Sequence, residues 1–312
     1  MPEIYQNELK IIKDIENYIK EPLPLVSEIS INGFGYVIES RHVVKIGLSN
    51  KNLSSIPESI CSLPYLRILS INNNSISDLP NNFKNLKSLK KLYLTRNNFH
   101  YFPDTLTYLE NLYFLDLGNN KINEIPDKIS CLKNLKEFYI QYNSITEFPN
   151  SIGNLKNLKH LNASNNRISS LPITFSQLRK LLTLNLRSNL LQNLPDNFGN
   201  IMDLRECILN ENKLEKLPES IGLLKRLKKL KLSYNNLISL PESIGNLTRL
   251  EELYLDNNNL ISLPESLANL RSLHTITLNG NPKLTNLSSE LIEWLKNIFK
   301  DRKALFFYNI DI

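Results

Sequence analysis

Hydrophobic residues recur along this chain with a period of 23 residues. In the segment from Leu112 to Leu132, apolar side chains stand at the first, fourth and sixth positions, an Asn at the ninth and a Pro at the fifteenth. Ten prolines mark the same point of the frame: Pro57, Pro80, Pro103, Pro126, Pro149, Pro172, Pro195, Pro218, Pro241 and Pro264. A self-similar frame of this length indicates a solenoid of stacked units. We therefore expect one elongated domain.

The apolar first, fourth and sixth positions of the frame predict a short strand whose side chains point alternately inward and outward. Stacking these strands in register makes a parallel sheet, so the fold class is an α/β repeat solenoid. The ninth position is Asn in ten repeats, from Asn74 to Asn281. An Asn side chain both donates and accepts hydrogen bonds, which suits turn backbone that would otherwise be buried unpaired.

The two ends of the chain depart from the frame and predict caps. Residues 6–20 carry apolar side chains at spacings of three and four, which predicts an amphipathic helix, and residues 33–41 predict a hairpin leading into the first repeat strand. After Asn281 the register fails, and a second helical pattern contains Trp294. We expect an N-terminal cap at 1–42, eleven repeats at 43–281, and a C-terminal cap helix with a tail at 282–312. The tail from Ala304 to Ile312 is expected to form a last strand or a packed extension.

Composition agrees with a soluble folded protein. Of 312 residues, 41% are hydrophobic and 22% are charged, and no apolar run reaches the roughly 18 residues that a membrane span needs. The N-terminus lacks the uninterrupted hydrophobic stretch of a secretory signal, so we expect a cytoplasmic protein. Three cysteines cannot all pair, and we expect Cys61, Cys131 and Cys207 to be reduced and structural.

No residue pattern in the chain indicates catalysis. The four histidines show no zinc spacing, and neither a P-loop nor a dinucleotide-binding glycine motif is present. Glycines such as Gly153 and Gly199 recur at one frame position and belong to the repeat. We expect no enzyme activity, no cofactor and no metal.

The pattern LxxLxLxxNxLxxLPxxIxxL is that of leucine-rich repeat proteins. Its 23-residue Leu-Pro form is similar to the intracellular Ras-pathway scaffold group, to the plant intracellular relatives of that group, and to the repeat modules of Roco GTPases. The resemblance covers residues 43–281 and implies a right-handed horseshoe with its parallel sheet on the concave side and helical caps. It also implies a Ras-like GTPase or a phosphatase assembly as the class of partner.

Function is expected at positions that the frame leaves free, chiefly the third and fifth, which point out of the concave sheet. Repeats three to six, with one residue of the next, place aromatic and charged residues there or at the edge: Lys91, Tyr93, Arg96, Phe114, Asp116, Glu137, Tyr139, Tyr142, His160, Asn162 and Arg187. Exposed aromatic side chains flanked by charges are typical of protein-binding hot spots. The alternative is that these aromatic residues stack across strands only for stability.

The net charge of +6 and the isoelectric point near 9.0 admit nucleic acid or an anionic membrane as partners. The most basic run, from Lys225 to Lys231, contains Lys229, which the frame places between Glu206 and Glu252 on neighbouring strands. We therefore rank nucleic-acid binding below a protein-binding scaffold, expected to be monomeric. A secreted or injected effector that inhibits a host enzyme is the main alternative.

Overall fold

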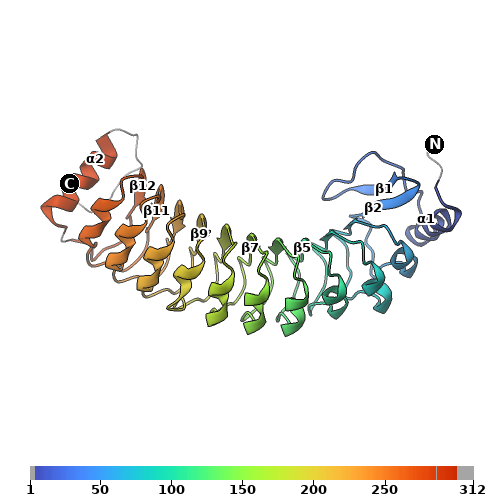
Figure 1. Ribbon diagram of the computed structural model, residues 1–312, viewed down its shortest axis with the longest axis horizontal. Coiled ribbons are helices and arrows are strands. Elements are labelled where there is room, and N and C mark those ends of the chain that lie inside the picture. The colour runs from blue at the N-terminus through green and yellow to red at the C-terminus, as the bar shows by residue number, and fades with distance from the viewer. Residues whose placement is uncertain (1–3, 286, 301–312) are drawn as a thin grey trace. The chain divides into compact units, whose positions relative to one another are not determined.

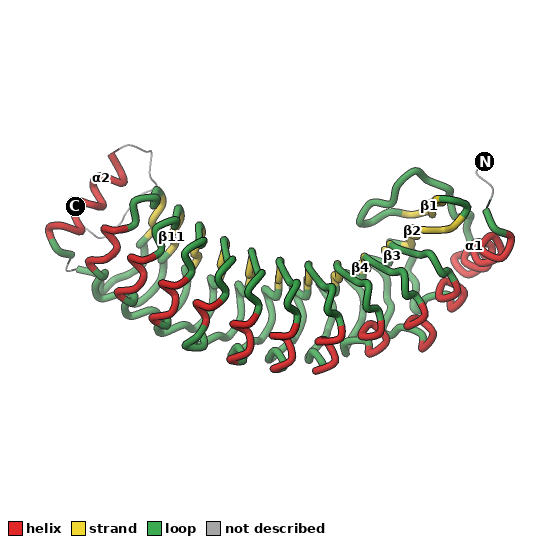
Figure 2. The backbone as a smooth tube through the Cα atoms, in the orientation of Figure 1, coloured by secondary structure: helices red, strands yellow, loops and turns green. Residues whose placement is uncertain are grey.

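The computed structural model describes residues 4–285 and 287–300, and the chain divides into two compact units, residues 1–145 and 146–312. In both units a short strand is followed by a 3-10 helix, and this pair recurs from repeat to repeat (Figure 1). Strands and 3-10 helices lie on opposite sides of each repeat (Figure 2). The expected tail structure at 304–312 falls outside the described residues.

Over residues 4–145, the first unit contains one α-helix and six strands. Strand order in its sheet follows the sequence; β1 and β2 are antiparallel, and the later strands are parallel. The elements are α1 (Gln6–Ile19), β1 (Phe34–Glu39), β2 (His42–Leu48), β3 (Ile68–Ser70), β4 (Lys91–Tyr93), β5 (Phe114–Asp116) and β6 (Glu137–Tyr139). The predicted helix and hairpin are thus both present.

Helix α1 packs on the first repeat through its apolar stripe and one buried carboxylate. Ile12 and Ile15 are buried, as the helical spacing predicts. Glu8 is also buried; its Oε2 accepts a hydrogen bond from the Val43 N–H at 2.6 Å, and its Oε1 lies 2.7 Å from Nδ1 of His42. Because a buried carboxylate is costly unless it is paired, these two contacts tie the helix to the start of β2.

Each proline of the frame stands immediately before a 3-10 helix, apart from Pro195, which lies three residues before one. Proline suits this place because its φ is fixed and its missing N–H is not needed, while its carbonyl accepts the first turn's hydrogen bond, as Pro80 does from Phe83 at 2.9 Å. In the first unit the 3-10 helices are η1 (Glu58–Ser62), η2 (Asn81–Asn85), η3 (Asp104–Tyr108) and η4 (Asp127–Cys131).

The Asn ladder joins each repeat to the one before it. Asn97 Nδ2 donates to the carbonyl oxygens of Ile71 at 3.0 Å and Leu94 at 3.1 Å, while its Oδ1 accepts from the Ile76 N–H at 3.1 Å. Asn97 is buried, so this one side chain satisfies backbone groups that water does not reach. Asn74 and Asn258, in the two units, make the same set of bonds.

The second unit continues the same repeat with six parallel strands in sequence order and a C-terminal helix. The strands are β7 (His160–Asn162), β8 (Thr183–Asn185), β9 (Glu206–Ile208), β10 (Lys229–Lys231), β11 (Glu252–Tyr254) and β12 (Thr275–Thr277), and the last helix is α2 (Ser289–Lys300). The 3-10 helices are η5 (Asn150–Asn154), η6 (Ile173–Gln177), η7 (Phe198–Asn200), η8 (Glu219–Leu223), η9 (Glu242–Asn246) and η10 (Glu265–Asn269). Leu291 and Leu295 of α2 are buried, as expected for a cap helix.

Candidate functional site

Three adjacent strands of the first unit carry six of the predicted site residues on one exposed face of the sheet. The strand register pairs Lys91 with Phe114 and Phe114 with Glu137, and it pairs Tyr93 with Asp116 and Asp116 with Tyr139. Between them, the fourth-position side chains such as Leu115 point into the core and are buried. The alternation predicted from the frame therefore holds on β4, β5 and β6, and we call this surface the strand-face cluster.

The rings of Tyr93, Phe114 and Tyr139 form a continuous aromatic row. The centroids of Tyr93 and Phe114 are 4.6 Å apart, and those of Phe114 and Tyr139 are 5.4 Å apart, with tilted planes in both pairs. Such pairs favour tilted or offset packing, worth about 0.5–1.5 kcal/mol beyond area burial. All three rings are half-buried, so the row keeps one side open to solvent. Phe114, at its centre, has no polar atom to make that exposure favourable.

Asp116 lies between the two tyrosines in the strand register and is largely covered. Its Oδ1 accepts hydrogen bonds from the Thr95 hydroxyl and the Gly118 N–H, both at 2.9 Å. Burial raises the pKa of Asp116, although these two hydrogen bonds oppose the shift. Asp116, one of the predicted site residues, therefore stabilises the turns that follow β4 and β5.

Glu137 and the tyrosines are electrostatically coupled. The Tyr139 hydroxyl donates a hydrogen bond to Glu137 Oε2 at 3.2 Å. Burial raises the pKa of Tyr139 to about 12, and the neighbouring Glu137 carboxylate adds to the shift because a second negative charge beside it is unfavourable. Burial and Glu137 raise the pKa of Tyr93 in the same direction. Both tyrosines therefore keep their hydroxyl protons throughout the neutral range.

Arg96 and Tyr142 stand at the rim of the cluster with an unusual backbone. Their φ angles are both 55°, in the left-handed region, and both side chains are exposed. The eighth frame position adopts this conformation in every repeat from Asn73 to Gly280, and Asn or Gly occupies it in half of them. Asn and Gly tolerate positive φ best, so a bulky residue there costs stability. Lys91, the remaining basic residue, has its Nζ 5.7 Å from the Phe114 ring centre.

Sequence reasoning missed a loop that covers the sheet face beside this cluster. The carbonyl oxygen of Ile31 accepts hydrogen bonds from the Ser70 hydroxyl and from Asn72 Nδ2, the latter at 3.0 Å. A Cβ on Gly47 would come within 2.4 Å of the Gly33 carbonyl oxygen, so the loop also lies directly on β2. In the sequence, the small residues Gly47 and Ser70 at the fifth position of the first two repeats could have indicated that this face is covered. The open face of this unit therefore begins at β4.

The other predicted site residues lie in the second unit and make local contacts. His160 Nδ1 shares a hydrogen bond of 2.8 Å with the Thr183 hydroxyl on the next strand, and Asn162 Oδ1 accepts from the Ser164 hydroxyl at 2.9 Å. Arg187 Nε donates to Glu211 Oε1 at 3.0 Å, and this guanidinium lowers the pKa of Glu211. The sequence did not suggest this Arg–Glu pair, because the two residues stand at different frame positions of neighbouring repeats.

The strand face of the second unit is charge-balanced, as the sequence predicts. In the register, Lys229 pairs with Glu206 on one side and with Glu252 on the other, and its Nζ lies 2.8 Å from Glu252 Oε1. Beside this face, Lys228 pairs with Glu251 at 2.7 Å. The basic run therefore leaves little unbalanced charge on this face.

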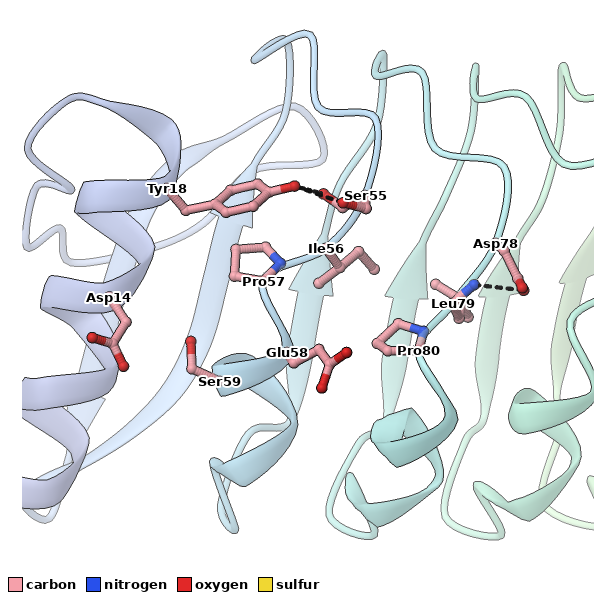
Figure 3. A pocket seen from close by; sticks show the side chains of 10 residues that line it. All are labelled: Asp14, Tyr18, Ser55, Ile56, Pro57, Glu58, Ser59, Asp78, Leu79 and Pro80. Carbon is pink, nitrogen blue, oxygen red and sulfur yellow. Dashed lines mark hydrogen bonds between the residues drawn. The ribbon is translucent and has the colours of Figure 1, made fainter.

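An open groove lies between α1 and the first two repeats (Figure 3). It has a volume of about 560 Å³ and a rim that carries Asp14, Glu58 and Asp78. The Tyr18 hydroxyl closes one side by a hydrogen bond of 2.6 Å with the Ser55 hydroxyl. Within residues 4–285 and 287–300, no three His, Cys, Asp or Glu side chains come together to hold a metal ion.

Two family models match the chain. One, described as "Leucine-rich repeat region", matches residues 29–143 and 195–300, and the other, "Leucine rich repeat", matches residues 133–191. The chain therefore belongs to the leucine-rich repeat family, and the predicted solenoid fold class is confirmed. Proteins of this kind are in general non-catalytic modules that bind protein partners. The comparison with curated protein sequences finds no match.

Solved structures place the fold among leucine-rich repeat proteins. A TDR receptor matches with a TM-score of 0.75 at 28% identity over 86% of this chain and 47% of its own. The plant peptide hormone receptor RGFR1 matches with a TM-score of 0.68 at 31% identity over 79% of this chain and 43% of its own. An internalin, InlF, from Listeria monocytogenes matches with a TM-score of 0.72 at 20% identity over 88% of this chain and 78% of its own, which concerns the fold alone.

The chain spans less than half of the length of the two receptors it matches. Among the helices that the structure describes, none has the length and apolar character to cross a bilayer.

Proposed function

We propose that the chain is a non-enzymatic protein-binding module whose strand-face cluster holds the partner. The observation that carries the proposal is the aromatic row of Tyr93, Phe114 and Tyr139, stacked at 4.6 and 5.4 Å and open on one side. Exposed, rigidly packed aromatic side chains are enriched at binding hot spots because they bury large areas with little loss of conformational entropy. Stability alone does not require Phe at the exposed centre of the row.

The rim of the cluster supports the same proposal. Tyr142 is 54% exposed and holds a φ of 55° at a position where Asn or Gly is the less strained choice. A residue that costs backbone stability and gains no burial is explained if its side chain acts on something outside the chain. Arg96 occupies the equivalent place two repeats earlier and adds a guanidinium to the same rim.

The partner is a protein or a peptide. The RGFR1 structure, 31% identical to this chain over the matched region, is of that receptor in complex with RGF2, so a fold of this kind accepts a ligand of this chemical class. The likeness of the 23-residue frame to Ras-pathway scaffolds makes a Ras-like GTPase or a phosphatase assembly the first partner class to test. The three free cysteines favour an intracellular setting, where thiols stay reduced.

The proposal is tested by placing a photoreactive benzoylphenylalanine at position 114 and, as a control, at position 108. Tyr108 is an aromatic residue on the 3-10 side of the preceding repeat, and it is more exposed than Phe114, so accessibility does not favour position 114. We expect a partner to be cross-linked from position 114 and not from position 108. With that partner purified, Phe114→Ala should weaken binding by about 30-fold, the loss typical of a hot spot, while Tyr108→Ala should leave it unchanged. Identical cross-links from both positions, or unchanged affinity of a folded Phe114→Ala variant, would reject the proposal.

A further inference from the structure

Basic residues of the second unit gather along one edge of its sheet, where the chain enters each strand. The edge is formed by frame positions 22 and 23 of one repeat and position 2 of the next. Its members that carry positive charge are all exposed: Lys156, Lys159, Arg179, Lys180, Arg205, Lys225, Arg226, Lys228, Arg249 and Arg271. We call this set the basic edge.

The charge of the basic edge is not balanced by its own acidic residues. Only two acids, Asp203 and Glu251, stand at the same frame positions of residues 146–285. Asp203 bonds Arg226 at 2.5 Å, and Glu251 bonds Lys228 at 2.7 Å. The ten basic and two acidic residues leave an excess larger than the net charge of +6 of the whole chain. The positive charge of this protein is therefore concentrated rather than dispersed.

The centre of the basic edge is hollowed into an open groove of about 710 Å³, lined by Arg205, Lys225, Arg226, Lys228, Thr248 and Arg249. Half of the lining residues are arginines, whose planar guanidinium groups match the oxygen pairs of a phosphate. Lys225 Nζ is held by the Asn246 carbonyl oxygen at 3.0 Å, which fixes its position without removing its charge. Five positively charged side chains therefore lie close together in the groove.

The chemistry of the edge discriminates between classes of anionic partner. Met202, at 54%, is the one large apolar side chain of the edge that is strongly exposed among residues 146–285. A protein partner needs apolar anchors in the centre of its interface, and a peripheral membrane face inserts apolar side chains into the bilayer. The edge offers positive charges repeated along a line and almost no apolar surface. The ligand that matches this arrangement is a polymer of phosphates. At these frame positions of residues 146–285, no exposed aromatic ring is present to stack unpaired bases.

We propose that the basic edge binds the phosphate backbone of a duplex nucleic acid without reading its sequence. Neighbouring strands are about 4.8 Å apart, so six repeats extend for about 25 Å, the length of about seven base pairs of duplex at 3.4 Å each. This surface is distinct from the strand face, where Lys229 lies between two glutamates. Binding here neutralises phosphates, displaces counterions, and depends steeply on salt.

The test uses fluorescence anisotropy with a labelled 20-base-pair DNA duplex of arbitrary sequence and an RNA duplex of the same length. Titrations run from 50 to 200 mM KCl. The variant is Arg205→Gln with Arg249→Gln, which removes two groove guanidiniums. The control is Lys213→Gln with Lys216→Gln, which removes the same charge from exposed residues of the same unit that lie off the edge. Circular dichroism confirms that both variants fold.

We expect wild type and the control to bind the duplex alike at 50 mM KCl. The arginine variant should bind about tenfold more weakly, and its slope of log affinity against log salt should be lower by about two. A second duplex sequence should bind with the same affinity. Absence of binding at 50 mM KCl, an equal loss in both variants, or stronger binding to phosphatidylserine vesicles than to either duplex would overturn the proposal.

Discussion

Replacing Asn212 by Ala tests the physical account of the repeat. Asn212 Oδ1 accepts from the Leu191 N–H at 3.0 Å, and its Nδ2 donates to the carbonyl oxygens of Leu186 at 2.9 Å and Leu209 at 3.0 Å. The two carbonyls keep a second partner in the variant, because Asn189 donates to Leu186 and Asn235 donates to Leu209, each at 3.0 Å. Only the Leu191 N–H is left with no acceptor.

These hydrogen bonds determine how much stability Asn212→Ala should lose. One buried N–H without a partner costs about 1–3 kcal/mol, and each weakened carbonyl adds about 0.5 kcal/mol. We expect Asn212→Ala to lower the free energy of unfolding by about 2–4 kcal/mol. Asn236→Ala, at an exposed position of the following repeat, should change it by less than about 0.5 kcal/mol.

The assay combines urea unfolding, followed by circular dichroism, with hydrogen exchange read by mass spectrometry. Repeat arrays can lose cooperativity, so exchange at the Leu191 amide provides a local measurement. In the variant that amide should exchange much faster, while amides of the first unit keep their protection. If Asn212→Ala unfolds like Asn236→Ala, or if Leu191 stays protected, the hydrogen-bond account of the ladder is wrong.

Three further predictions concern single groups. Because the pKa of Tyr139 is raised to about 12 in the folded protein, the free energy of unfolding should fall between about pH 10, where a free tyrosine ionises, and pH 12. Urea unfolding measures this fall, and Tyr139→Phe should remove it. Gly199→Ala would place a Cβ 1.8 Å from a backbone carbonyl oxygen and should lower the melting temperature clearly, whereas Gly118→Ala meets the flexible end of a side chain at 2.4 Å and should be milder. A thiol reagent added to the native protein should modify only Cys131, since the other two cysteines are buried; labelling of all three would contradict the packing.

Features that repeat were predictable from the sequence, as were the N-terminal helix and hairpin, but the loop between α1 and β1 was not. The 23-residue frame indicated the strands, the Asn ladder and the pairing of Lys229 with its two glutamates, because neighbours in space are always one period apart. The loop that places Ile31 on Ser70 has no counterpart elsewhere in the described residues, so no periodicity in the sequence indicates it. The left-handed eighth position did leave a signal in its Asn and Gly residues, and it would have identified Tyr142 and Tyr234 as bulky residues at a position with positive φ.

The basic edge was overlooked for a related reason. Its residues fall at the end of one repeat and the start of the next, so reading repeats one at a time divides the surface in two. Lys225 and Lys228 belong to different repeats, yet they line the same groove. Cys131 is a correction of another kind, because it was expected to be structural and its side chain is exposed.

The Asn ladder determines the order in which the repeats can be completed during synthesis. The turn of each repeat is completed by an Asn that stands 21 residues after the amide it accepts from, as Asn212 does for Leu191. A growing chain on the ribosome therefore cannot finish one repeat until most of the next has emerged. Each repeat is therefore completed by the next one, and the repeat of Leu260 is completed by Asn281. Ribosome pausing near the end of the array would leave only its last turn incomplete.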